Sequence, residues 1–132
     1  MIVLDASVLV EYLTESDRGE EVRKRLAEES GWLWAPAIVD AEVGHALRSE
    51  VRRRAISSGR AEEALEALMA MRLERASHRF LAERSWQLRE NLSFYDGLYV
   101  ALAEALDAPL LTFDARLAKA PGILAEVDVI PV

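Results

Sequence analysis

The sequence contains no cysteine among its 132 residues, so disulfides, thiolate metal sites and cysteine nucleophiles are all excluded. Histidine is also scarce, with only His45 and His78 present. A metal site built from several imidazoles is therefore not expected. Any bound metal ion should be held by oxygen atoms, and oxygen ligands favour Mg²⁺ or Mn²⁺.

Long apolar runs are missing as well. An uncharged stretch over residues 31–39 is far too short for a membrane-spanning helix. The N-terminus has no basic segment and reaches Asp5 almost at once, which is unlike a signal peptide. We therefore expect a cytoplasmic protein. A hydrophobic fraction of 52% predicts a folded core, and the length predicts a single domain over residues 1–132.

The net charge of −7 argues against a general nucleic-acid-binding protein, but the charge is unevenly distributed. Residues 48–89 contain ten of the sixteen basic residues and six acidic ones, so this stretch is locally positive. Four of its arginines are expected on one helix: Arg48, Arg52, Arg53 and Arg54. Two interpretations stay open for them, a solvated helix face with ion pairs to Glu50 or a surface that follows nucleic-acid phosphates.

Short apolar segments alternate with amphipathic ones along the chain. Strands are expected at residues 1–4, 32–35, 110–113 and 127–130. Helices are expected at residues 7–13, 16–29, 36–56, 60–75, 80–91, 95–106 and 115–119. Strands that alternate with helices predict an α/β fold with a mainly parallel sheet covered on both faces.

Acidic residues occur at four separate places beside apolar segments: Asp5, Glu42, Asp96 and Asp114. Asp5 and Asp114 directly follow predicted strands, and Glu42 lies in the helix after another. Ligands bind outside the carboxyl ends of parallel strands, so these three acids should share one edge of the sheet. Asp96 begins a helix that leads into a strand, and topology alone does not place it there.

Clustered carboxylates indicate a bound cation. Like charges close together raise one another's pKa, and burial of an uncompensated charge is costly. A divalent cation keeps such carboxylates ionised, activates water and stabilises charge at a phosphate. Metal-dependent phosphodiester hydrolysis therefore fits the residues present. Taken singly, the three aspartates have another explanation as helix caps, and Glu42 as a solvent-facing residue.

Four segments carry a resemblance to a known family: Ile2-Val-Leu-Asp-Ala-Ser-Val-Leu, Pro36-Ala-Ile-Val-Asp-Ala-Glu-Val, Tyr95-Asp-Gly-Leu-Tyr-Val-Ala-Leu-Ala and Leu110-Leu-Thr-Phe-Asp-Ala-Arg-Leu. Together they resemble the motifs of PIN-domain ribonucleases, and more closely those of VapC toxins from bacterial toxin–antitoxin pairs. The resemblance covers essentially the whole chain, in order. It implies a three-layer α/β/α sandwich and a Mg²⁺- or Mn²⁺-dependent endoribonuclease. It also implies structured RNA such as tRNA or rRNA as substrate, inhibition of translation, a cognate VapB-type antitoxin and a homodimer.

The resemblance also implies roles for individual residues. The catalytic, metal-binding acids fall on Asp5, Glu42, Asp96 and Asp114, with Thr112 and Ser7 as supporting polar residues. We expect Asp5 and Asp96 to bind the metal most directly. Glu42 and Asp114 should bind it through water or hold a second ion, which leaves open whether one or two ions bind. Gly97 stands where the family commonly has alanine, which lowers helix propensity but removes no ligand.

Several nearby residues are expected outside the site. We expect Asp40 at a solvent-facing or capping position, His78 at the surface, and His45 packed or hydrogen-bonded rather than bound to metal. Ser7 fits a helix cap as well as a site residue, and Thr112 fits either the strand or the site. Trp32 and Trp34 are expected in the core. Trp86 is expected in the core or at a contact between two copies, with stacking against a base as a third alternative.

Three other functions remain to be weighed. A phosphatase of the haloacid-dehalogenase kind also begins with an Asp after a buried strand, but it needs a second Asp where Ser7 stands. A response-regulator receiver domain needs paired early acids and a late lysine, and this chain has only Lys24 and Lys119. A PIN-fold binding module without catalysis is the non-enzymatic alternative. An RNA assay with Mn²⁺, with and without chelator, separates it from a nuclease.

Overall fold

The computed structural model, which describes residues 1–132, contains one five-stranded sheet. The strands are β1 (Ile2–Leu4), β2 (Leu33–Pro36), β3 (Leu73–Ala76), β4 (Leu110–Thr112) and β5 (Val127–Val129). Their order is β3-β2-β1-β4-β5, and every neighbouring pair is parallel. The predicted α/β class with a parallel sheet is confirmed.

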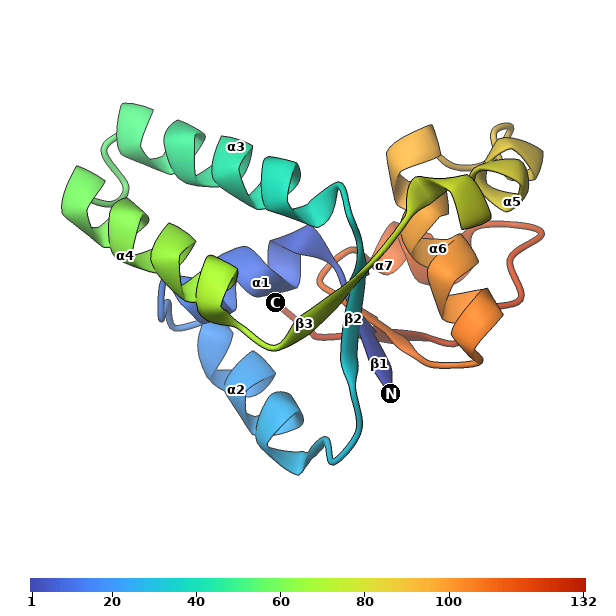
Figure 1. The fold of residues 1–132 in the computed structure, drawn as a ribbon, viewed down its shortest axis with the longest axis horizontal. Helices are drawn as coiled ribbons and strands as arrows, with labels where there is room; N and C mark the ends of the chain where they lie inside the picture. The colour runs from blue at the N-terminus through green and yellow to red at the C-terminus, as the bar shows by residue number, and fades with distance from the viewer.

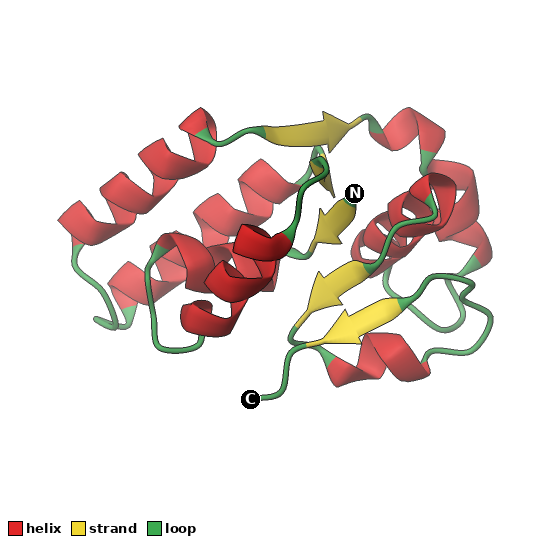
Figure 2. Ribbon diagram, turned by 90° about the horizontal axis from the view of Figure 1, so that it is seen from below, coloured by secondary structure: helices red, strands yellow, loops and turns green.

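Helices cover both faces of this sheet. They are α1 (Ala6–Leu13), α2 (Gly19–Glu28), α3 (Val39–Arg52), α4 (Ser58–Ala70), α5 (Ala82–Gln87), α6 (Phe94–Leu106) and α7 (Ala115–Lys119), with a 3₁₀ turn at His78–Phe80. Helices α1 to α4 gather on one side of the strands, and α5 and α6 lie on the other (Figure 1). The same two groups of helices flank the strands when the molecule is seen from below (Figure 2). The predicted three-layer arrangement is therefore confirmed. None of the helices is both long and apolar enough to span a bilayer.

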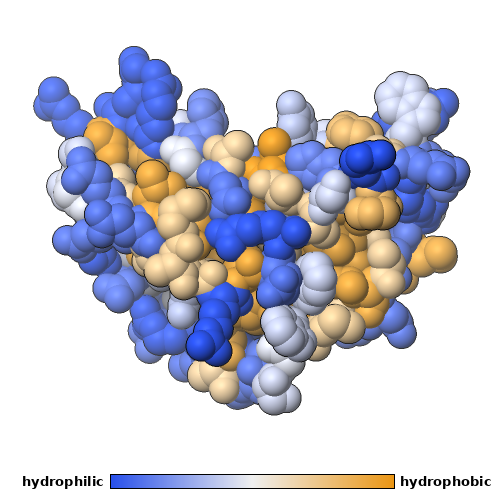
Figure 3. Space-filling model, in the orientation of Figure 1, coloured by the Kyte–Doolittle hydropathy of each residue, from blue (hydrophilic) through white to orange (hydrophobic).

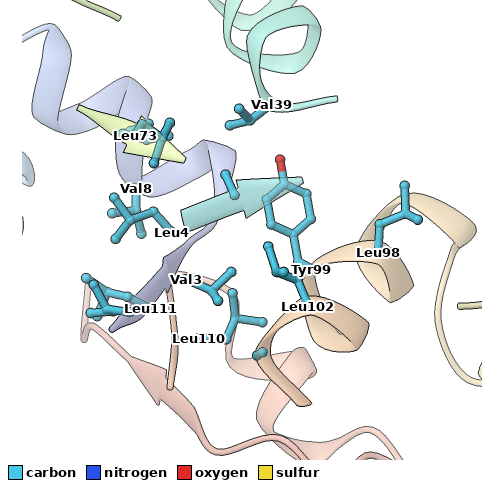
Figure 4. Close-up of a cluster of buried hydrophobic side chains, with 14 of the residues drawn as sticks. Val3, Leu4, Val8, Val39, Leu73, Leu98, Tyr99, Leu102, Leu110 and Leu111 are labelled. Atoms are coloured by element: carbon cyan, nitrogen blue, oxygen red, sulfur yellow. The ribbon is translucent and has the colours of Figure 1, made fainter. Parts of the chain in front are cut away.

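The core lies where the two central strands meet α6. Residues 2–4 and 110–112 are all buried, as expected for strands covered on both faces. Residues 97–103 of α6 are buried as well, and Tyr99 packs among aliphatic side chains of the core (Figure 4). This packing fixes the N-terminal end of α6, where Asp96 lies, against the central strands.

One strand was not predicted. The amphipathic pattern that begins at Arg60 was expected to continue as a helix to Arg75, but α4 ends at Ala70 and residues 73–76 form β3. The segment Leu73-Glu-Arg-Ala has no apolar alternation, because β3 is an edge strand and only Leu73 in it is fully buried. Its backbone pairs with β2 over four residues, and charged side chains suit an edge strand that must not pair further.

Three helix boundaries also differ from the prediction. Pro36 ends β2 rather than opening a helix, so α3 begins at Val39 and Glu42 lies in its first turn. The helix expected at residues 80–91 is a 3₁₀ turn followed by the short α5. The helix expected from Ser16 begins at Gly19, whose amide donates to the Ser16 hydroxyl at 3.2 Å.

Trp34 packs against the core as predicted, whereas Trp32 and His78 differ from the prediction and Trp86 keeps only its alternative as a contact residue. Trp32 is 65% exposed and Trp86 59% exposed, so neither is a core residue, and Arg89 stacks on Trp86. His78 is not a free surface residue, because its Nε2 accepts a hydrogen bond from the Ile38 amide at the start of α3. This contact satisfies one of the free amides of a helix N-terminus.

Two further predictions near the acids were wrong. Asp40 does not face solvent freely, because it accepts hydrogen bonds from the Arg75 guanidinium at 2.8, 3.0 and 3.2 Å. His45 is exposed and its side chain makes no hydrogen bond or ion pair, so it is not packed. Within α3, Asp40 therefore joins the helix to Arg75 of β3, while the His45 side chain is exposed and unpaired.

Candidate active site

The predicted acids lie where the direction of the sheet reverses. From β1 the chain adds β2 and β3 on one side, then crosses over to add β4 and β5 on the other. The crevice at such a switch point, at the carboxyl ends of the strands, is the usual ligand site in parallel sheets. Asp5 follows β1 and Asp114 follows β4, the two strands that flank this point.

Hydroxyl groups hold the Asp5 carboxylate. Its Oδ2 accepts hydrogen bonds from the Thr112 hydroxyl at 2.6 Å and from the Ser7 hydroxyl at 3.1 Å. Burial raises the pKa of the Asp5 carboxyl despite these two hydrogen bonds, and the charge of Asp96 raises it further. Asp5 occupies the N-cap position of α1 but makes no capping hydrogen bond through its side chain. The helix-cap explanation therefore does not account for Asp5.

Glu42 faces the same point from the first turn of α3. Its Oε1 accepts a hydrogen bond from the Tyr99 hydroxyl at 2.6 Å. The hydroxyl of Tyr99 points out of the apolar core towards α3 (Figure 4). Burial raises the pKa of Glu42, and the charges of Asp5 and Asp96 add to the rise. Glu42 is therefore directed into the site rather than towards solvent.

Asp96 completes a group of three acids. It lies in the first turn of α6, where Ser93 caps the helix by accepting a hydrogen bond from the Asp96 amide at 3.1 Å. The cap is thus Ser93, and no hydrogen bond or ion pair engages the Asp96 carboxylate. Its charge raises the pKa of both Asp5 and Glu42, so the three side chains lie close together.

Asp114 behaves differently from the other three acids. Its carboxylate accepts hydrogen bonds from the Arg116 guanidinium at 2.6 and 3.0 Å and from the Arg116 amide at 2.9 Å. This contact lowers the pKa of Asp114. Asp114 therefore caps α7 and already has a cationic partner. The amide of Asp114 in turn donates to the Thr112 hydroxyl at 3.0 Å, which links it to Asp5 through one side chain.

The donor atoms at this point fit a hard divalent cation. Asp5, Glu42 and Asp96 offer only oxygen, and no cationic side chain forms an ion pair with any of them, while burial is the main cause of the raised pKa values of Asp5 and Glu42. In the present conformation no three acids converge closely enough to coordinate one ion. Asp5, Glu42 and Asp96 are the residues that would hold such an ion.

Sequence reasoning missed two residues that shape the site. Tyr99 lies three residues after Asp96, and this spacing puts the two on one helix face, which is a signal the sequence does carry. Arg116 lies two residues after Asp114 in a short helix, and nothing in the sequence distinguishes it from a solvated arginine. Ser7 and Thr112 were both identified, and both hydroxyls contact Asp5.

The family model of the PIN domain matches residues 2–123. The chain belongs to the PIN-domain family. Within this family it is similar to Ribonuclease VapC1 of Mycobacterium tuberculosis strain H37Rv, with 47% identity over 129 residues, covering 97% of this chain and 96% of that protein. Ribonuclease VapC12 of the same strain is 38% identical over 130 residues, covering 98% of this chain and 99% of that protein.

Solved structures of PIN-domain proteins share the fold. A toxin–antitoxin complex from Klebsiella pneumoniae contains a chain with a TM-score of 0.73 and 20% identity, and each chain covers all of the other. The VapBC2 complex of Rickettsia felis, bound to a promoter DNA fragment, gives a TM-score of 0.66 at 18% identity and 98% coverage of both chains. The predicted resemblance to the PIN and VapC families is thus confirmed, and the phosphatase and receiver-domain alternatives are not supported.

Proposed function

We propose that this chain is a divalent-metal-dependent endoribonuclease that acts as the toxin of a toxin–antitoxin pair. The observation that carries the proposal is that Asp5 and Glu42 face the switch point of the sheet with only neutral hydroxyls bound to their carboxylates, while the carboxylate of Asp96, whose charge acts on both, has no partner. The 47% identity to a protein named as a VapC ribonuclease supports RNA as the substrate.

Each residue of the site has a proposed role in the reaction. A bound Mg²⁺ or Mn²⁺ ion supplies charge neutralisation at the scissile phosphate and activation of a water molecule. Asp5 and Asp96 would hold the ion, and Thr112 and Ser7 keep the Asp5 carboxylate in place. Glu42, fixed by Tyr99, and Asp114, which binds Arg116, would act through a water molecule or a second ion.

The biological context is proposed from the same family. The substrate would be structured RNA such as tRNA or rRNA, and cleavage would inhibit translation in the cytoplasm. Solved relatives are toxin–antitoxin complexes, which supports a VapB-type antitoxin as the partner of this chain. A homodimer is proposed as the functional assembly. Mapping of cut sites in total RNA with the purified protein would identify the substrate.

The test is cleavage of RNA by the purified chain with Mn²⁺, Mg²⁺ or chelator. Asp5→Asn and Asp96→Asn should each lower the cleavage rate at least about 100-fold, because even residues that only support metal ligands contribute about 10- to 100-fold. Circular dichroism should show that both variants keep the fold. Chelator should abolish cleavage by the unaltered chain, and Mn²⁺ should raise its melting temperature.

A matched control uses Asp107, an exposed aspartate at the opposite edge of the sheet. Its φ of 50° lies in the left-handed region, which asparagine tolerates well, so Asp107→Asn should leave cleavage unchanged. Metal-dependent cleavage retained by both Asp5→Asn and Asp96→Asn would contradict the assignment of the site. No cleavage and no metal binding by the unaltered chain would favour a PIN-fold binding module.

A further inference from the structure

A cleft opens beside the three acids, between α3 and the first turn of α6. It has a volume of about 290 Å³ and is lined by Ala41, Glu42, His45, Ala46 and Tyr95. The first four lie on one side of α3, at positions one, four and five residues after Ala41. The space-filling view shows the molecule hollowed at its upper edge, between α3 and the α5–α6 side (Figure 3).

The cleft is continuous with the catalytic acids. Glu42 belongs to both, since its carboxylate accepts the Tyr99 hydroxyl while the residue also lines the cleft. Tyr95 immediately precedes Asp96 in α6. A phosphodiester held at the acids would therefore place its adjoining nucleoside at the mouth of this cleft.

The two ring side chains in the cleft make no polar contact and suit a flat aromatic ligand. Tyr95 is 58% exposed, and neither Tyr95 nor His45 makes a side-chain hydrogen bond or ion pair. The methyl groups of Ala41 and Ala46 give an apolar floor. Tyrosine and histidine rings stack on unpaired RNA bases, and histidine nitrogens also bond to base edges.

We propose that this cleft binds the nucleobase next to the scissile phosphate, stacked on Tyr95 and bonded at its edge by His45. The inference rests on the proposed ribonuclease function and deepens it by assigning a base subsite. Because stacking on Tyr95 requires an unpaired base, the subsite selects a cleavage position in a loop or bulge of a structured RNA. A protein partner is the alternative occupant of this cleft, and nucleotide titration distinguishes it from a nucleobase.

The first measurement titrates the full chain with each of the four nucleoside 5′-monophosphates and follows the ring resonances of Tyr95 and His45 by NMR. We expect both rings to shift, and Tyr95→Ala to weaken binding about ten-fold, because one stacked base contributes on the order of a ten-fold change in affinity. Tyr95→Phe keeps the ring and should keep the affinity. Trp32→Ala removes a similarly exposed ring at the amino ends of the strands and should have no effect.

The second measurement compares cleavage of a mapped RNA substrate with the same RNA lacking the base beside the cut. Base removal should lower kcat/KM about ten-fold for the unaltered chain but much less for Tyr95→Ala, since the base and the ring form one interaction. Equal losses for both proteins would overturn the proposal. Ring resonances unmoved by every mononucleotide, together with dissociation of a dimer by Tyr95→Ala, would assign the cleft to a contact between copies and also overturn it.

Failure of the proposed function looks different from failure of this inference. Cleavage that depends on Asp5 and Asp96 but is indifferent to Tyr95 and to the missing base would keep the nuclease and remove the subsite. Nucleotide binding in the cleft by a chain that cuts no RNA would support the ligand class while contradicting the nuclease.

Discussion

At the scale of single residues, Asp114 differs from Asp5 and Glu42 in the group that binds its carboxylate. Neutral hydroxyls of Thr112 and Tyr99 bind Asp5 and Glu42, so these two carboxylates keep their negative charge available. Arg116 neutralises Asp114 directly. Neutral donors orient a carboxylate without competing for its charge, which is what a site for a metal cation requires.

The raised pKa of Asp5 predicts how the metal-free protein responds to pH. A carboxyl whose pKa is raised by folding favours the folded state below its unfolded pKa, and this contribution is lost as pH rises through the raised value. Asp5→Asn carries no charge at any pH. In chelator, the variant should therefore gain stability relative to the unaltered chain as pH rises from about 4 to about 8. Urea unfolding at both pH values measures this difference.

A comparison with bound Mn²⁺ makes the pH prediction specific. Mn²⁺ at about pH 8 should remove the advantage of Asp5→Asn, because the ion stabilises only the chain that retains the carboxylate. A stability difference between Asp5→Asn and the unaltered chain that is the same at both pH values would contradict the prediction.

At the scale of helices and strands, local patterns predicted the elements that carry the acids. Apolar runs of three or four residues next to Asp5 and Asp114 identified β1 and β4 because both strands are covered on both faces. The edge strand β3 could not be predicted the same way, since Arg75 is explained only by its tertiary contacts. Its guanidinium bonds to Asp40 and to the carbonyls of Leu73 and Leu68.

Local sequence patterns also failed to predict the positions of the exposed aromatic residues and of the histidines. Trp32 and Trp34 were expected in the core from their alternation, but Trp32 lies before the first residue of β2 and faces solvent. His78 contacts α3 across forty residues of sequence, a relation no local pattern contains. Convergence of strand ends predicted a common position for Asp5, Glu42 and Asp114, and the family resemblance added Asp96, whereas individual contacts between elements could not be predicted.

Gly97 shows how a contact between helices reverses a prediction made from helix propensity. Propensity alone predicts that Gly97→Ala stabilises α6 by up to about 1 kcal/mol. A Cβ at this position would lie 2.3 Å from the hydroxyl of the buried Ser85, which donates to the Phe94 carbonyl at 2.7 Å. We therefore expect Gly97→Ala to destabilise the chain by about 1–3 kcal/mol in urea unfolding, because the α5–α6 contact must open.

Two variants isolate this close approach. In a Ser85→Ala background the Cβ added by Gly97→Ala would meet no hydroxyl, so the cost of the glycine substitution should shrink. Gly44 in α3 has nothing within 4 Å of its added Cβ, so Gly44→Ala should stabilise the chain slightly. Equal stabilisation by Gly44→Ala and Gly97→Ala would show that propensity, not the helix contact, decides.

At the scale of the whole molecule, an acidic protein must bind a polyanion. The net charge is −7, yet α3 begins at the acids and ends in a group of arginines. Arg53 pairs with Glu50 at 2.6 Å, as one of the two interpretations predicts, whereas Arg48, Arg52 and Arg54 are exposed and unpaired. At 1.5 Å per residue, Arg52 lies roughly 15 Å along the helix from Glu42. That distance suits contact with phosphates flanking the cut.

We predict that these three unpaired arginines contribute to RNA affinity through phosphate contacts. Replacing Arg48, Arg52 and Arg54 by glutamine should weaken binding of a single-stranded RNA to the cleavage-deficient Asp96→Asn chain. Each lost phosphate contact should also reduce the slope of log affinity against log salt concentration by about 0.7. Fluorescence anisotropy over a range of salt concentrations measures both quantities.

A matched control carries the same change in net charge at the opposite side of the molecule. Arg23, Lys24 and Arg72 are also exposed and without an ion pair, on α2 and before β3, towards the amino ends of the strands (Figure 1). Their replacement by glutamine alters the long-range field but removes no phosphate contact near the acids. If both triple variants reduce the salt slope equally, net charge accounts for RNA binding and the α3 arginines are a solvated helix face. A larger reduction for the α3 variant alone extends the RNA path from the cut along α3.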